Sequence, residues 1–280
     1  MISIEQLNID IKKDNIIEGI IKSNGLYCLV AEPKVDKSFL ALQIANSLTN
    51  NKEFLEFKVN PTPVYISTEL SDLQFKERLN ITSYEFSPNS FFFLEKDSNH
   101  GLCLIDDLQL ELKEFLEAYN GKFVIVDIMC GIDYGYKLDI NNYSDVMKRM
   151  FDKYRELSKK YNLTFLLVHH LNKEGKTLGS TGIDGNMNGI LTLINNKDNT
   201  YTLKITNRDF EEQNLNLIKN DKLIFEIMNE YNTESDFNLL AFMRYAIKKK
   251  EVIFTPAEMV AELNLLITPS RFGRLLNSNI

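Results

Sequence analysis

The chain has 280 residues, of which 44% are hydrophobic, and its formal net charge is −7. This length and composition predict one large domain with a sizeable core and a small appendage. The acidic balance argues against a general nucleic-acid binder, so any contact with nucleic acid should be local or formed in a channel between several chains.

No apolar run reaches membrane-spanning length, and the first residues lack the basic flank and apolar core of a signal peptide. The three cysteines, Cys28, Cys103 and Cys130, are odd in number and unpaired in spacing. This pattern argues against a disulfide framework and a structural zinc site. We therefore expect a cytoplasmic protein with no membrane partner.

Strand-like and helix-like patterns alternate from the beginning of the chain to about Gly189. Strands are predicted at residues 26–30, 64–67, 91–94, 123–127 and 165–169. Helices are predicted at residues 37–48, 72–79, 107–118 and 143–161. This alternation predicts an α/β fold with a mostly parallel sheet flanked by crossover helices.

After Gly189 the pattern changes to short segments rich in β-branched residues. Residues 190–194, 200–205 and 223–227 are expected to be antiparallel strands at the sheet edge. A break at residues 230–236 precedes a segment that is predicted to be helical only. We expect an α/β domain at residues 1–230 and a helical segment at residues 236–280.

The first motif with chemical meaning is Ala-Glu-Pro-Lys-Val-Asp-Lys-Ser at residues 31–38, between an apolar strand and an apolar helix. A phosphate-binding loop reads G-x-x-x-x-G-K-[ST]. Lys37 and Ser38 match this pattern and would reach phosphate and magnesium, whereas Ala31 and Asp36 replace both glycines. The alternative is a helix start that contains Lys-Ser by chance.

Two acids end predicted strands. Asp127 follows four apolar residues and could hold magnesium through water, or it could simply cap the next segment. Glu69 ends another predicted strand and could polarise an attacking water, or it could be a surface residue that opens the next helix.

His169 and His170 end a third predicted strand, and one of them could sense a phosphate by hydrogen bonding. A two-histidine metal site is a rival interpretation, but it lacks a third ligand at a sensible spacing. One histidine of the pair could instead only satisfy backbone groups.

The segment at residues 172–185 is polar and contains glycine, so it could bind the phosphates of a nucleic-acid strand or be an ordinary connection. Arg208 follows a predicted strand. It could be delivered to the phosphate of a neighbouring subunit, or pair with Asp209.

In this order, the motifs resemble the RecA-like ATPases of plasmid and phage replication helicases, the hexameric RepA-like group. The resemblance covers about residues 14–228. It rests on the loop with its flanking strand and helix, on residues 16–21 as a lead-in turn, and on residues 64–69, 124–127, 167–170, 179–183 and 207–209.

The resemblance implies an ATP-dependent DNA helicase or ATPase of a mobile element, which forms a six-membered ring and acts on single-stranded DNA. ATP would bind with Mg²⁺ at the subunit interfaces. The implied residues are Lys34, Asp36, Lys37 and Ser38 for ATP; Ser38 and Asp127 for magnesium; Glu69, His169 or His170, and Arg208 for catalysis; and Lys173, Lys176, Ser180 and Thr181 for DNA.

Three residues depart from the family pattern: Ala31, Asp36, and Asn188, where an acid is usual. A carboxylate about 4 Å from a phosphate costs on the order of 4 kcal/mol at an effective dielectric constant near 20. Unless Asp36 points away or pairs with Lys34, we expect weak ATP binding and low turnover. A non-hydrolysing scaffold that binds DNA or a replication partner is the alternative function, and a recombination or annealing ATPase shares the same core.

The C-terminal segment predicts helices at residues 237–248, 255–265 and 270–276. Thr255 and Glu258 form a capping-box pattern with Pro256 at the first helical position. The last two helices resemble a winged-helix module without its wing, and Arg271 and Arg274 could contact DNA. The alternative is that these helices pack on the core or on a neighbouring subunit.

Overall fold

The fold is seen in a computed structural model of the chain. It describes residues 14–68, 70–86, 91–94, 103–104, 110, 113–118, 122–129, 132–133, 139, 141–171, 183–196, 200–228, 242, 245–246, 254–263, 265 and 267–279. The chain divides into two compact units, Met1–Glu226 and Ile227–Ile280. Among the described residues, no helix combines the length and the apolar character needed to cross a membrane.

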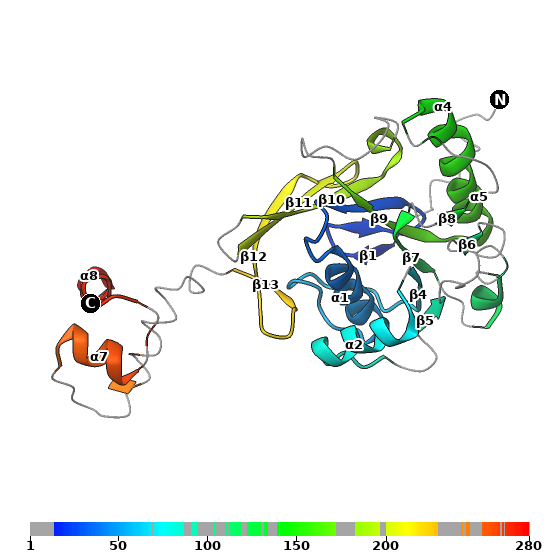
Figure 1. The fold of residues 1–280 in the computed structure, drawn as a ribbon. Coiled ribbons are helices and arrows are strands. Elements are labelled where there is room, and N and C mark those ends of the chain that lie inside the picture. The colour runs from blue at the N-terminus through cyan, green and yellow to red at the C-terminus, as the bar shows by residue number, and fades with distance from the viewer. Residues whose placement is uncertain are drawn as a thin grey trace. The chain divides into compact units, whose positions relative to one another are not determined.

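The first unit is built on a nine-stranded sheet (Figure 1). Its strands are β3 (Leu26–Ala31), β4 (Val64–Thr68), β5 (Phe91–Leu94), β7 (Phe123–Asp127), β9 (Thr164–His170), β10 (Gly189–Asn195), β11 (Thr200–Asn207), β12 (Gln213–Lys219) and β13 (Phe225–Ile227).

The strand order is β13-β12-β11-β10-β3-β9-β7-β4-β5. All neighbours from β10 to β5 are parallel, whereas β10, β11 and β12 form an antiparallel meander. Two further pairs lie outside this sheet: β1 (Asn15–Ile17) with β2 (Ile21–Lys22), and β6 (Cys103–Leu104) with β8 (Ile132–Asp133).

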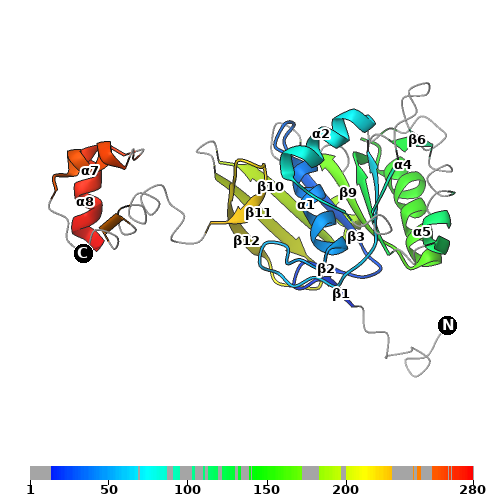
Figure 2. The same ribbon diagram turned by 90° about the horizontal axis from the view of Figure 1, so that it is seen from below.

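Helices cover both faces of the sheet (Figure 2). On one face lie α1 (Lys37–Thr49) and α2 (Asp72–Thr82). On the other lie α4 (Tyr143–Asp145), a π-helical segment (Val146–Phe151) and α5 (Asp152–Tyr161), which together form one long helix.

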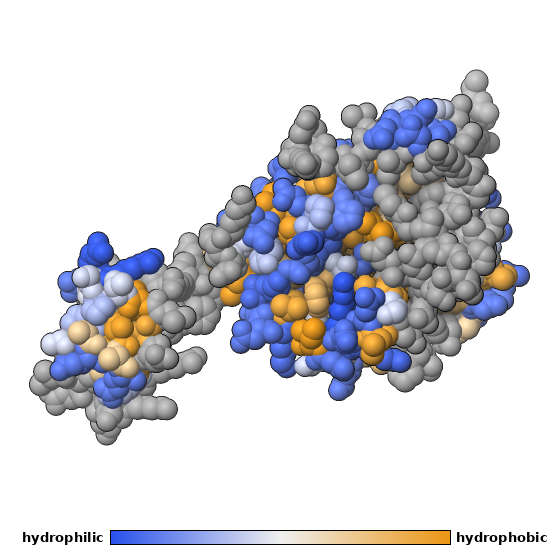
Figure 3. All heavy atoms as spheres, in the orientation of Figure 1, coloured by the Kyte–Doolittle hydropathy of each residue, from blue (hydrophilic) through white to orange (hydrophobic). Residues whose placement is uncertain are grey.

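The central strands are buried on both faces, which explains why they read as continuous apolar runs. Every residue of β3 is buried, and its alternate residues Leu26, Cys28 and Val30 join the core under α5. In that core, the fully buried rings of Tyr154 and Phe165 meet edge to face at 5.2 Å between centroids. On the face drawn in Figure 3, the described surface of this unit mixes polar and apolar residues.

The predicted α/β class, with a parallel sheet and antiparallel edge strands, is confirmed. The predicted parallel strands and the helices at residues 37–48 and 72–79 are present, with ends shifted by no more than three residues. The edge differs. The strand predicted at residues 223–227 begins at Phe225, and β12 was not predicted because its Gln-Asn-Leu-Asn-Leu pattern is too polar to stand out as a strand.

The second unit contains α7 (Pro256–Glu262) and α8 (Pro269–Asn279) around a small core of Phe242, Met259, Phe272 and Leu276. The predicted capping box is confirmed, because Thr255 and Glu258 bond each other's backbone amides at 3.3 and 2.7 Å. The helix predicted at residues 237–248 lies largely outside the described residues.

We expect Phe165→Ala to destabilise the first unit by about 3–5 kcal/mol, because it leaves a cavity beside Tyr154. The free energy of unfolding, measured by chemical denaturation, tests this. Leu73→Ala is the control, because Leu73 on α2 is 68% exposed and should change stability little. Equal losses in both variants would contradict this packing.

Candidate functional site

The parallel register brings the carboxyl ends of four strands to one edge of the sheet. Ala31 of β3 pairs with His170 of β9, and Thr68 of β4 pairs with Asp127 of β7. Because β9 lies between β3 and β7, the predicted loop, histidine pair and aspartate meet there. Glu69 directly follows Thr68 but lies outside the described residues.

The loop between β3 and α1, the phosphate-type loop, contains two residues in the left-handed backbone conformation, and neither is glycine. Lys34 has φ 66° and Asp36 has φ 41°. Such a residue costs about 1–2 kcal/mol, although aspartate tolerates the conformation better than most. Asp36 is the N-cap of α1, yet its side chain makes no capping hydrogen bond. The first N–H groups of α1 are therefore not covered by this carboxylate, and a helix start of this kind attracts anions.

The carboxylate of Asp36 points toward the edge strands instead. It forms an ion pair with Lys219 at the end of β12 and accepts a hydrogen bond from the Tyr201 hydroxyl of β11 at 3.4 Å. The suggested pairing of Asp36 with Lys34 is wrong, since Lys34 has no ion pair among the described residues. Lys219 is 183 residues away from Asp36 along the chain, so no local spacing indicates this pair.

Lys37, the first residue of α1, is buried. Its ammonium donates to the Glu32 carbonyl at 3.2 Å and lies 3.1 Å from Nδ1 of His170. Burial lowers the pKa of Lys37, and the charges of Asp127 and Asp36 oppose that shift. A cation is thus fixed beside the open start of α1.

The two histidines differ in their surroundings. His169 is fully buried, whereas His170 is half-buried and is the one that reaches Lys37. Burial, the Lys37 charge and His169 all lower the pKa of His170. His170 is therefore neutral near pH 7, and its Nδ1 accepts from the Lys37 ammonium.

Ser38 and Asp127 line the same small cavity between α1, α2 and β7. The other lining residues are Ala41, Leu42, Ile66, Leu70, Phe75, Arg78 and Ile125. A hydroxyl and a carboxylate are hard oxygen donors, which suit Mg²⁺ when phosphate oxygens supply further ligands. The residues at this edge therefore fit a magnesium-bound phosphate chain.

Arg208 lies at the opposite end of the strands, where β3 begins. It directly follows Asn207, the last residue of β11. Asn207 pairs with Gly189 of β10, which in turn pairs with Tyr27 near the start of β3. Its guanidinium donates to the Gly185 carbonyl at 2.5 Å. The alternative pairing with Asp209 is wrong, because Asp209 pairs with Lys22 at 4.0 Å.

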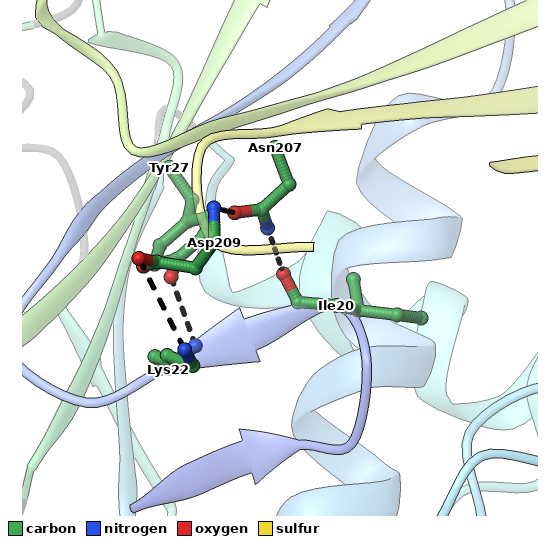
Figure 4. Close-up of polar contacts among 5 residues, drawn as sticks. All are labelled: Ile20, Lys22, Tyr27, Asn207 and Asp209. Atoms are coloured by element: carbon green, nitrogen blue, oxygen red, sulfur yellow. Dashed lines mark hydrogen bonds and ion pairs between the residues drawn. The ribbon is translucent and has the colours of Figure 1, made fainter. Parts of the chain in front are cut away.

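The backbone on both sides of Arg208 is held in place (Figure 4). The Asn207 side chain donates to the Ile20 carbonyl at 2.6 Å and accepts from the Asp209 N–H at 3.0 Å. The buried Tyr27 hydroxyl accepts from the Lys22 N–H at 2.8 Å, and burial raises the pKa of Tyr27 to about 12. These contacts fix the turn while leaving Arg208 exposed.

Asn188, the third departure from the expected pattern, has a structural role at this second edge. Its side-chain oxygen accepts from the Leu26 N–H at 2.9 Å, and its own N–H donates to the Leu26 carbonyl at 2.7 Å. It anchors the start of β3, far along the strand from the phosphate-type loop.

The other sequence candidates are those expected to contact DNA. Lys173, Lys176, Ser180 and Thr181 lie outside the described residues. Arg271 and Arg274 are exposed on α8 of the second unit. Sequence reasoning missed Tyr201 and Lys219, which no local motif marks.

Comparison with known proteins identifies the family of the chain and a shared fold. A family model described as the AAA domain matches residues 8–176. Among solved structures, an ATPase domain aligns with a TM-score of 0.62 over 79% of this chain and 94% of that chain, at 11% identity. At this identity the likeness concerns the fold, which is RecA-like as the sequence predicts. No curated protein sequence matches the chain.

We expect the pKa of His170 to rise in Lys37→Met, because the variant removes a positive charge that disfavours the imidazolium. The pKa should stay below 6.5, since the burial remains. An NMR titration of the ring resonances measures it. Lys34→Met, at an exposed lysine of the same loop, should leave the pKa unchanged, and an unchanged value in Lys37→Met would contradict the contact.

Proposed function

The chain belongs to the AAA domain family, and we propose that it binds ATP with Mg²⁺ at the edge formed by β3, β9 and β7. The observation that carries the proposal is the uncapped start of α1, with the Lys37 ammonium fixed beside it. Backbone N–H groups of the loop and Lys37 would hold the phosphates. Ser38 and Asp127, which line one cavity, would hold the magnesium ion.

The proposed activity is ATP hydrolysis coupled to movement on single-stranded DNA, in the replication of a plasmid, phage or other mobile element. The order of the sequence motifs and the fold shared with a solved ATPase domain support it. Glu69 would polarise the attacking water. His170 is better placed than His169 to sense phosphate, because it already contacts Lys37.

A ring of subunits, six by resemblance, is the proposed assembly. Arg208 lies at the edge opposite its own phosphate-type loop, so it could serve only the nucleotide of a neighbour. Head-to-tail rings join two different faces of the subunit in this way. Lys173, Lys176, Ser180 and Thr181 would contact DNA in the channel, and Arg271 and Arg274 would add a contact from the second unit.

A non-hydrolysing scaffold is the second candidate, favoured by the acid at residue 36. We also propose that nucleotide binding is weaker than in a loop with glycine at this position, because the carboxylate remains close to the phosphates even when it is paired.

We expect ATP hydrolysis that single-stranded DNA stimulates, and a loss of at least about 100-fold in Lys37→Ala, because a fixed cation at the phosphates is removed. Phosphate release with and without DNA measures both. Lys52→Ala, at an exposed lysine just beyond α1, is the matched control and should retain activity. Tight nucleotide binding without turnover would favour the scaffold instead.

We expect mixtures of Lys37→Ala and Arg208→Ala subunits to regain activity that each variant alone lacks. In a mixed ring, an Arg208→Ala subunit supplies an intact loop and a Lys37→Ala neighbour supplies the arginine. Random mixing in equal amounts makes about a quarter of the interfaces intact, so about a quarter of the wild-type rate should return. Mixtures as inactive as the single variants would exclude a role for Arg208 across the interface.

A further inference from the structure

Two features of Asp36 bear on anion binding at the start of α1. Aspartate is among the side chains that most readily cap a helix start, where its carboxylate accepts the first free N–H groups. A carboxylate in that position would also repel a phosphate. In this chain Asp36 occupies the N-cap position, yet its side chain makes no such bond and turns to Lys219 and Tyr201.

Lys219 is well placed to hold the carboxylate there. Both side chains of the pair are about three-quarters buried or more, at 18% exposure for Lys219 and 26% for Asp36. The Lys219 ammonium also lies 5.4 Å from the centre of the Tyr201 ring. Burial lowers the pKa of Lys219, but the hydrogen bonds to Asp36 and Tyr201 outweigh it and the net pKa is raised. Lys219 therefore stays protonated at neutral pH and donates to the Asp36 carboxylate.

The edge strands that carry Lys219 and Tyr201 are themselves fixed to α1. The buried side chain of Gln43 donates to the Phe225 carbonyl at 2.8 Å and accepts from the Phe225 N–H at 2.9 Å. The rings of Tyr201 and Phe225 meet edge to face at 5.2 Å. Phe225 of β13 therefore links α1 to the start of β11, so packing sets the distance between α1 and the residues that hold Asp36.

From these contacts we infer that Lys219 is a positioning residue of the phosphate-type loop. It holds the Asp36 carboxylate off the start of α1 and cancels its charge, which allows a loop without glycines to accept the phosphates of a nucleotide. The inference rests on the proposed function, and it assigns to β12 a role in nucleotide affinity that acts through Asp36.

A double-mutant cycle tests this assignment. The variants are Lys219→Met, Asp36→Gly and the double variant, with affinity measured by titrating a fluorescent, non-hydrolysable ATP analogue with Mg²⁺. Lys219→Met should weaken binding at least tenfold, because it frees the carboxylate. In the Asp36→Gly background, Lys219→Met should lower the affinity less than threefold, since there is no carboxylate left to hold.

Three controls separate positioning from other roles. Lys219→Arg should restore most of the affinity. Lys222→Met, at an exposed lysine in the turn that follows β12, should match the wild type. Thermal unfolding checks that the variants are folded, and Asp36→Asn replaces Asp36→Gly if the glycine loosens the loop.

The outcomes are distinguishable. Unchanged affinity in Lys219→Met overturns the inference and leaves the proposed function intact. An equal loss in both backgrounds also overturns it, because Lys219 would then act on the phosphates directly. Absence of nucleotide binding in the wild type and in every variant overturns the proposed function together with the inference.

Discussion

The in-register parallel pairing of β3, β9, β7 and β4 is the constraint on which the rest of this structure depends. Parallel strands end at a common edge, so each polar residue that follows an apolar run arrives at the same place. Ala31 beside His170, and Thr68 beside Asp127, follow from backbone hydrogen bonding alone. The register of the strands therefore brings the polar residues of the candidate site together, without help from contacts between their side chains.

The antiparallel meander of β10, β11 and β12 adds a second consequence. Because β11 runs back across the sheet, its first residues lie at the edge of the phosphate-type loop and its last residues lie at the opposite edge. Tyr201 can therefore donate a hydrogen bond to Asp36, while Arg208, seven residues later, lies at the opposite end of the strand. One strand thus connects the two opposite ends of the parallel strands.

Electrostatics explains how a loop without glycines can keep the geometry of an anion site. Asp36 adopts the left-handed conformation that glycine would supply, and its carboxylate forms an ion pair with Lys219 from another part of the chain. Lys37 is held by the Glu32 carbonyl and by a neutral His170, so it stays near the start of α1. Both cations at this edge are partly withdrawn from water, where charge interactions are stronger than at an exposed surface.

Local patterns in the chain were enough to establish the α/β class and the parallel strands. They also placed Asp127 and the histidines at strand ends and Lys37 at the start of a helix. Apolar runs and the polar residues that follow them are visible in short windows of sequence. The capping box of Thr255 and Glu258 was equally visible, since it spans one helical turn. Tertiary contacts alone settled where the Asp36 carboxylate points, which histidine meets Lys37, and that Arg208 lies at the far edge. These depend on strand order and direction, which are set by packing between residues far apart in the chain. The sequence does not mark β12, which lies between β11 and β13, because only two of its first five residues are apolar.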